Sequence, residues 1–277
     1  MTRPDRIRRL SFAERWFHDG LLVSHQPAFH QSIEVDISRI SAALKVVRKR
    51  GIRLTYTHVL VRAAGLALSA HPKIHLVLAG NRVQEPSGVD IALSVSGKGS
   101  VVPTLVIRNV DEKPIDVIAS EIPGRLPAVR EAHRKLLSTL DRWGWLVPFG
   151  PVRRAVLRLL FRSFRFRRNG AGTFQVTVVP GVDQGATPLF NAAAVLAAGT
   201  VKDRVIAENG VPVVRPTIFL TCSADHRVWN GQNCRTFLHA VQEILTGSVL
   251  EREILKIPAR RDVLKNAGSA RDALRNY

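Results

Sequence analysis

The sequence predicts an α/β fold with a mixed sheet, because segments with strand and helix periodicity alternate along the chain. Residues 29–37 alternate polar and apolar side chains, as a strand with one buried face does. Residues 38–50, directly afterwards, repeat apolar side chains every three or four positions, as a helix does. A hydrophobic content of 45% and a charged content of 23% are typical of a globular chain with a sizeable core.

The N-terminal quarter carries clear helix boundaries. Residues 10–17 predict a short helix, since Ser11 and Glu14 have the spacing of a capping box. The helix that begins at Ser38 is expected to end before Gly51, a residue suited to the left-handed position after a helix. Residues 57–70 are apolar almost all round, which predicts a buried helix.

A strand-rich region follows, after His71 and Pro72 interrupt the buried helix. Alternating and apolar runs predict strands, and 97–99 has the composition of a hairpin turn. The predicted strands are 74–79, 89–96 and 101–107. Another helix is expected from 114 to 122.

The middle of the chain is basic. Residues 126–140 predict a helix, and residues 143–150 form an aromatic turn with two tryptophans. Residues 151–168 contain seven arginines and no acid. On a helical projection two faces separate: Arg154, Arg158, Arg162 and Arg165 on one, and Val152, Val156, Leu159, Leu160 and Phe164 on the other.

Two interpretations of 151–168 remain open. A basic amphipathic helix preceded by tryptophans has the composition of an interfacial membrane helix. A helix that packs its apolar face on its own domain or a neighbouring subunit, and solvates its arginines, would look the same in so basic a chain.

The C-terminal third returns to strands. Predicted strands cover 174–179, 192–199 and 217–222, with a long loop before 188. Residues 205–214 predict a hairpin around Asn209 and Gly210, a pair that favours a tight two-residue turn. A helix is expected over 232–246, and residues 258–277 form a charged, weakly patterned tail.

The chain carries 41 lysines and arginines against 22 acids, a formal charge of +19. Such an excess favours anionic partners, among them nucleic acid, an anionic membrane surface and phosphate-bearing small molecules. Because no aromatic-basic platform or recognition motif is present, we do not expect nucleic acid to be the partner.

Cysteine and histidine usage restricts the site further. Cys222 and Cys234 form no CxxC pair, which suits a reducing cytoplasm and argues against a disulfide scaffold or zinc site. The histidines at 30, 58, 71 and 75 have no metal-ligand spacing, so no metal is expected. No signal peptide and no apolar run of about 18 residues are evident, so we expect a cytoplasmic protein, peripheral at a membrane at most.

The segment Ser223-Ala-Asp-His-Arg-Val-Trp-Asn-Gly231 stands between a predicted buried strand and a predicted helix. A histidine at the end of a buried strand is a candidate general base on a stiff support, because imidazole exchanges protons near neutral pH. A purely structural histidine at a strand end is the alternative.

This segment resembles the S-x-D-H-R-x-x-D/N-G signature of the acyltransferase (E2) components of 2-oxoacid dehydrogenase complexes, a family that shares its fold with chloramphenicol acetyltransferase. Residues 174–201 resemble the family's F-T-I-S…N-A-P…A-I-L-G-V segment. The first half of the chain adds further matches: Ile33-Glu-Val-Asp-Ile, Leu54-Thr-Tyr, His71-Pro-Lys, Val89-Asp-Ile-Ala-Leu-Ser-Val and Val101-Val-Pro-Thr-Leu-Val-Ile-Arg-Asn-Val-Asp. The resemblance covers about 28–123 and 173–247.

The resemblance implies a two-layer sandwich and a coenzyme A-dependent acyltransferase. The acyl group would move from a coenzyme A or lipoyl thioester to a thiol, hydroxyl or amine, with His226 as general base and no acyl-enzyme. Asn230, where most members carry aspartate, would hold the active-site loop, and Asp225 and Arg227 would be a structural ion pair. Thr187 would stabilise the oxyanion. Coenzyme A would be a substrate, its binding residues stay unassigned, and the assembly would be a trimer or built from trimers.

Two departures from the family pattern shape the expected role. No lipoyl domain, subunit-binding domain or Ala/Pro linker precedes the matched region, so no lipoate is expected on the chain. Residues 126–168 replace a short link in the family. We therefore expect residues 1–277 to be one catalytic domain with a basic helical insertion at 126–168 and a loosely held tail at 258–277, acting as a stand-alone acyltransferase. A dehydrogenase-complex core with the lipoyl domain in trans, and a catalytically silent membrane-associated scaffold, are the alternatives.

Overall fold

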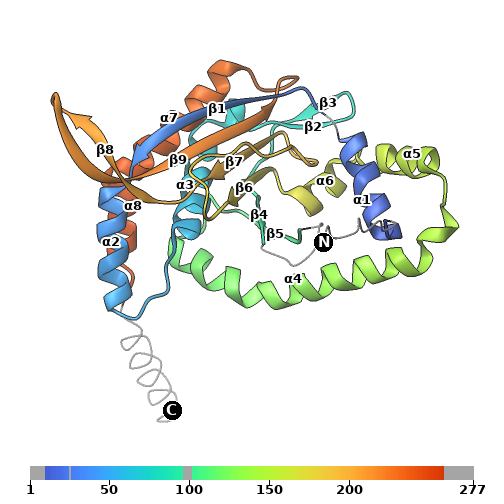
Figure 1. The fold of residues 1–277 in the computed structure, drawn as a ribbon, viewed down its shortest axis with the longest axis horizontal. Coiled ribbons are helices and arrows are strands. Elements are labelled where there is room, and N and C mark those ends of the chain that lie inside the picture. The colour runs from blue at the N-terminus through green and yellow to red at the C-terminus, as the bar shows by residue number, and fades with distance from the viewer. Residues whose placement is uncertain (1–9, 25, 96–101, 259–277) are drawn as a thin grey trace, which may run out of the picture.

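The computed structural model describes residues 10–24, 26–95 and 102–258. Its main element is a mixed seven-stranded sheet in the order β1-β9-β7-β6-β4-β5, with β8 paired to β9 (Figure 1). Strands β4, β6 and β7 run parallel to one another, and the remaining pairs are antiparallel. The strands are β1 (Ala28–Asp36), β4 (Ile91–Ser94), β5 (Thr104–Ile107), β6 (Phe174–Val178), β7 (Ala194–Ala198), β8 (Lys202–Glu208) and β9 (Val211–Asp225). The predicted α/β class with a mixed sheet is confirmed.

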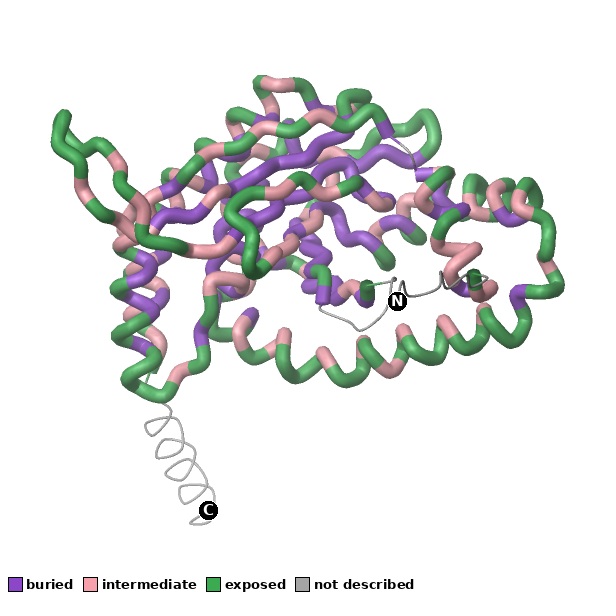
Figure 2. Tube along the Cα trace, in the orientation of Figure 1, coloured by how far each residue is buried: buried purple, intermediate pink, exposed green. Residues whose placement is uncertain are grey.

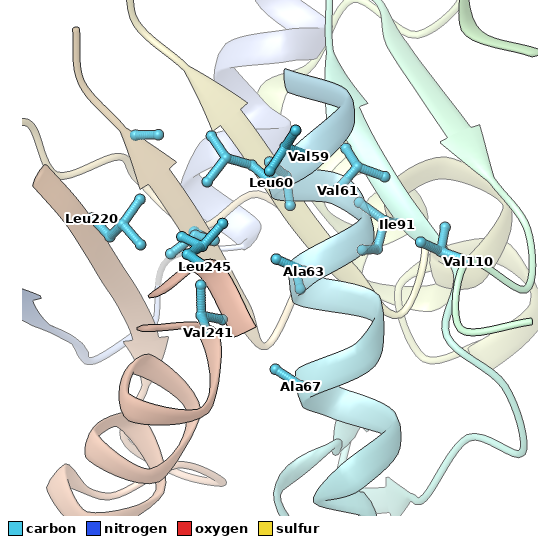
Figure 3. Packing of buried hydrophobic residues seen from close by; sticks show 14 of the residues in the cluster. Val59, Leu60, Val61, Ala63, Ala67, Ile91, Val110, Leu220, Val241 and Leu245 are labelled. Carbon is cyan, nitrogen blue, oxygen red and sulfur yellow. The ribbon is translucent and has the colours of Figure 1, made fainter. Parts of the chain in front are cut away.

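Helices pack on one face of this sheet and form the second layer. They are α2 (Ser38–Lys49), α3 (Tyr56–Ala70), α7 (Gly231–Thr246) and α8 (Ser248–Leu255). Helix α3 is buried along its length, and Figure 3 shows its Val59, Ala63 and Ala67 close to side chains of β4, β9 and α7. The predicted buried helix and two-layer arrangement are therefore confirmed.

Local sequence signals set several boundaries correctly. Helix α1 (Phe12–Val23) begins with the predicted capping box, in which Ser11 and Glu14 satisfy each other's backbone N–H groups. The hairpin between β8 and β9 turns at Asn209 and Gly210, whose φ angles of 53° and 79° fit a tight two-residue turn. The predicted turn at 97–99, and the tail beyond residue 258, lie outside the described residues.

Other strand predictions changed in extent. The segment after Pro72 opens as a short 3-10 helix, η1 (Pro72–Ile74), and only then forms β2 (Val77–Ala79). Strand β2 pairs with β3 (Arg82–Gln84) in a separate two-stranded sheet. The strand predicted at 217–222 is the inner part of β9, which extends to the hairpin on one side and to the motif on the other.

The helix predictions between residues 114 and 168 changed in extent. Residues 114–122 and 126–140 are one helix, α4 (Ile115–Trp143), which continues through Pro123 and Pro127. Both prolines are exposed, so the carbonyls that lose a helical partner there can face water. Figure 1 shows α4 running along one edge of the molecule to α1, and Figure 2 shows most of its length exposed.

Residues 151–168 are likewise two helices and not one. After η2 (Gly144–Leu146), α5 (Gly150–Leu160) is followed by α6 (Phe164–Ala171). Ser163 accepts a hydrogen bond from the Phe166 backbone N–H and so begins a new helix. In α5 the buried residue is Arg153, whereas apolar residues such as Leu159 are exposed, because Arg153 pairs with buried Asp19 of α1. None of the described helices is long and apolar enough to cross a bilayer.

Candidate active site

His226 directly follows the last residue of β9. Its backbone N–H donates to the Pro27 carbonyl at 2.9 Å, and its ring lies 4.9 Å from the Phe29 ring, centroid to centroid. Both contacts come from the beginning of β1 and the residue before it, because β1 pairs antiparallel with β9 and places Phe29 opposite Ala224. The His226 side chain is exposed and free to meet a substrate.

The residues around His226 hold the turn in place. Asp225 is fully buried, and its carboxylate accepts hydrogen bonds from Arg227 Nε at 2.9 Å and Nη2 at 2.7 Å. The Asp225 carbonyl also accepts from the backbone N–H groups of Val228 and Trp229. Trp229 is buried and packs against Phe237. The predicted structural ion pair between Asp225 and Arg227 is confirmed.

Asn230 is the N-cap of α7. Its Oδ1 accepts from the Asn233 backbone N–H at 2.9 Å, so the amide satisfies one of the unpaired N–H groups at the start of the helix. The next residue, Gly231, lies so close to Gln31 that a Cβ would come within 3.1 Å of the Gln31 Nε2. The structure therefore gives Asn230 a capping function at the junction between the His226 turn and α7.

Thr187 lies beside Ser223, which in turn contacts His30, a grouping that the sequence did not predict. Ser223 Oγ is 2.8 Å from His30 Nδ1, and the Thr187 backbone N–H donates to the same Ser223 oxygen at 3.4 Å. The Thr187 Oγ1 is buried and has no hydrogen-bond partner among the described residues. His30 and Ser223 meet because β1 and β9 pair in this register, which no local sequence pattern reveals.

Two cavities meet at Thr187. One, of about 580 Å³, is lined by His30, Gln26, Thr187 and apolar residues of α1. The other, of about 500 Å³, is lined by Thr187 together with Thr177, Gln175 and the aromatic rings of Phe17 and Phe190. His226 is in the lining of neither cavity. Neither of these two cavities is therefore shared by the candidate base and the candidate oxyanion donor.

The two cysteines and the buried His58 lie outside the candidate site. Cys222 and Cys234 are free and buried, as predicted, and burial raises the pKa of the Cys222 thiol. Within the described residues no cluster of three or more histidines, cysteines and acids could hold a metal ion. His58 is buried, and its Nδ1 accepts the Thr55 backbone N–H at the start of α3.

Comparison with known proteins gives a consistent match. Residues 13–138 and 170–250 match the family model of 2-oxoacid dehydrogenases acyltransferase (catalytic domain). The lipoamide acyltransferase component of the branched-chain alpha-keto acid dehydrogenase complex of Bacillus subtilis is 28% identical over 220 residues, 77% of this chain and 45% of that protein. A dihydrolipoyllysine-residue succinyltransferase of Bartonella vinsonii is 28% identical over 76% of this chain and 46% of its own length. The chain thus spans about half the length of these curated relatives.

Solved structures agree on the fold. A probable dihydrolipoamide acetyltransferase of Listeria monocytogenes has a TM-score of 0.65 at 23% identity, covering 87% of this chain and 94% of that one. The dihydrolipoamide acetyltransferase of Azotobacter vinelandii has a TM-score of 0.64 at 21% identity, covering 91% and 94%. The family match leaves out residues 139–169, which include the end of α4, the whole of α5 and most of α6. The chain belongs to the family of 2-oxoacid dehydrogenase acyltransferase catalytic domains.

Proposed function

We propose that this protein is an acyltransferase that moves an acyl group from a coenzyme A or lipoyl thioester to a thiol, hydroxyl or amine acceptor. The observation that carries the proposal is His226, an exposed imidazole at the end of a buried strand, held by the Pro27 carbonyl and by a turn in which buried Asp225 binds Arg227. The family to which the chain belongs supports the same reaction.

The proposed reaction needs one proton carrier. His226 removes the acceptor proton as the acceptor attacks the thioester carbonyl carbon, which gives a tetrahedral intermediate with a negative oxygen. Collapse of this intermediate breaks the carbon–sulfur bond, and the imidazolium returns the proton to the leaving thiolate. No acyl-enzyme forms, and coenzyme A acts as a substrate.

The oxyanion donor is proposed to be Thr187, whose buried and unpartnered Oγ1 is the supporting observation. Thr177 is a second candidate, because it lines the same cavity of about 500 Å³ from strand β6. Alanine variants at the two positions distinguish them. Loss of an oxyanion hydrogen bond lowers kcat by about 10²–10³, so only the variant at the true donor should show that loss.

Asn230 is proposed to maintain the His226 turn through its cap on α7. The Azotobacter vinelandii structure concerns the role of a serine, a histidine and an asparagine in catalysis, and there the histidine and asparagine are four residues apart. His226 and Asn230 have the same separation. This spacing supports a function for Asn230 close to the reacting groups.

We propose a trimer-based assembly in which a neighbouring subunit completes the site. The exposed His226 and its absence from the two cavities at Thr187 support this, since a site open to bulk water would allow hydrolysis of the thioester substrate. One of the similar structures is described as the cubic core of the pyruvate dehydrogenase multienzyme complex, and cubic symmetry contains threefold axes. A reducing cytoplasm is the proposed location, because both cysteines are free.

The helical insertion is proposed to contact an anionic membrane surface. Aromatic and aliphatic side chains are exposed together around the turn from α4 to α5, among them Trp143, Trp145, Leu146 and Phe149. Exposed arginines of α5 and α6 supply the complementary charge. Co-sedimentation with phosphatidylcholine–phosphatidylserine vesicles tests this. Trp145→Ser with Phe149→Ser should abolish binding, and Val205→Ser with Val214→Ser on the exposed hairpin is the control. Equal binding by both pairs would remove the proposal.

A donor screen tests the enzymatic proposal directly. Free thiol release is measured with a panel of acyl-coenzyme A thioesters and acyl-dihydrolipoamides against thiol, hydroxyl and amine acceptors. His226→Ala should lower turnover by about 10²–10⁴, while His239→Ala, an exposed histidine of α7, should not. Preference for lipoyl donors would indicate a dehydrogenase-complex core. Unchanged turnover in His226→Ala would instead favour a catalytically silent scaffold.

A further inference from the structure

A cavity of about 490 Å³ lies where the inserted helices meet the end of β9, and four arginines line it: Arg158, Arg162, Arg167 and Arg227. The first three come from the loop and helices of the insertion, and Arg227 follows His226 in the motif. The turn between β2 and β3 and the C-terminal end of α1 complete the wall. We call this the arginine pocket.

Arg167 is the most unusual member of the arginine pocket. It is 6% exposed, and its Nε donates a hydrogen bond to the Asn191 carbonyl at 3.2 Å. Its two Nη groups donate to no atom of the described residues, and no described carboxylate pairs with it. The Nη groups are not among the fully buried atoms that lack a partner, so they reach the open space of the pocket and can donate to an anion there.

The charges near Arg167 also favour an anion in the pocket. Burial, followed by the proximity of Arg227, lowers the pKa of Arg167 to about 10, whereas Asp225 acts in the opposite direction. Arg167 thus remains protonated at neutral pH and is repelled by Arg227. The carboxylate of Asp225 is already occupied by Arg227. No acidic side chain lines the pocket.

Three other arginines of α5 and α6 have acidic partners within the chain. Arg153 and Arg154 share Asp19, and Arg168 binds Asp90. Arg158 and Arg162 have no ion pair with any described residue, and both face the cavity. Their charges are therefore available to a ligand in the pocket.

Two residues with left-handed backbone, Gly80 and Asn191, and three apolar side chains also line the arginine pocket. Gly80 has a φ of 65°, and a Cβ there would lie 3.4 Å from the Arg162 Cγ, so the arginine lies across the turn. Asn191 is also left-handed, at 63°, and its buried Oδ1 has no partner among the described residues. Phe161, Leu78 and Val23 supply an apolar wall.

We infer that the arginine pocket binds an anionic group, a phosphate or a carboxylate, carried by a small molecule. Guanidinium groups bind both anions through paired hydrogen bonds, and three converging arginines without carboxylates favour the doubly charged phosphate. The apolar wall leaves room for a short uncharged portion of the ligand. This site does not require the acyl-transfer proposal, because it depends on the pocket's own charges.

Calorimetric titration of the full chain with inorganic phosphate tests the inference. Saturable binding of one phosphate per chain is expected, with at least a tenfold loss of affinity in Arg158→Gln with Arg162→Gln, and in Arg167→Gln. Arg165→Gln is the matched control, because Arg165 is an exposed arginine of α6 outside the pocket lining. Absence of saturable binding, or equal affinity in the pocket and control variants, would overturn the inference.

Further arms separate this site from catalysis and identify the phosphate source. Phosphate binding should persist in His226→Ala, so a failed turnover assay leaves the test of the pocket intact. If coenzyme A displaces phosphate and dephospho-coenzyme A does not, the pocket takes the ribose phosphate of coenzyme A. If neither displaces it, the ligand is a separate small anion. Should Arg167→Gln not fold, the exposed pair Arg158 and Arg162 still decides the outcome.

Discussion

Asn230 caps α7 and lies four residues after His226, so its substitution can change both stability and activity. Asn230→Ala removes the side-chain acceptor for the Asn233 N–H and should lower the free energy of unfolding by about 1 kcal/mol. Asn230→Asp retains an acceptor and adds a negative charge at the helix N-terminus, where it is favourable.

Urea unfolding of the Asn230 variants, with Asn233→Ala as the control, measures this difference. The control keeps the backbone donor and removes only a side chain that accepts no cap bond. Equal stability of Asn230→Ala and the wild type would show that water replaces the cap. If Asn230→Asp keeps stability but loses turnover, the amide has a role beyond capping.

His75 predicts how stability depends on acid. Burial lowers its pKa from 6.5 to about 4, an effect that Asp111 and Asp90 oppose and Arg168 reinforces. Between these two values the unfolded chain binds a proton that the folded chain does not. The contribution is therefore complete above pH 6.5 and is lost as the pH falls towards 4.

The expected loss from His75 across this interval is roughly 3 kcal/mol. Unfolding free energies measured by urea denaturation between pH 4 and 7 should show a shallower pH slope for His75→Leu than for the wild type. His239→Leu, at an exposed histidine, should keep the wild-type slope. An unchanged slope in His75→Leu would assign the acid sensitivity to other groups.

At the scale of elements, two buried acids attach the basic helices α5 and α6 to the rest of the chain. Asp90 at the start of β4 accepts from Arg168 of α6 and from Arg108 after β5. Burial raises the pKa of the Asp90 carboxyl, but the hydrogen bonds from Arg168 and Arg108 outweigh it, so the net shift is downward. Asp19 of α1 holds α5 in the same way, through Arg153 Nε at 2.7 Å and Arg154 Nη1 at 3.1 Å.

The Asp19 contact gives a prediction for the α1–α5 interface. Asp19→Asn leaves the buried Arg153 guanidinium without its countercharge, which should cost about 3–5 kcal/mol of unfolding free energy. Glu131→Gln on α4 is the control, since Glu131 pairs with Arg134 and Lys135 at the surface and should change stability by under about 1 kcal/mol. Thermal and urea unfolding would contradict the interpretation if the two variants behaved alike.

At the scale of the whole molecule, the proposed trimer with a shared site predicts that activity depends on assembly. Light scattering coupled to size exclusion should give the mass of three chains or a multiple of it. Specific activity should fall on dilution below the concentration at which trimers dissociate, because each site would then lose the neighbouring subunit. A monomer with full, concentration-independent activity would contradict the shared site and place all its parts on one chain.

Short-range patterns predicted a substantial part of this structure. The capping box at Ser11, the turn at Asn209 and Gly210, and the buried helix α3 all depend on residues near one another in the chain. Predictions failed where distant contacts decide. Nothing near Pro123 indicates that α4 continues, and nothing in α5 indicates that Asp19, 134 residues away, would turn Arg153 inward.

In the candidate site, too, some features follow from the sequence alone and others from tertiary contacts. By itself the sequence determined the family motif, the candidate base His226 and the excess of arginines, because these are properties of residue identity and spacing. Only the tertiary structure decided that His30 bonds Ser223 and that four arginines surround one cavity. The physical reason is strand pairing: the β1–β9 register and the packing of the insertion join residues that no local pattern relates.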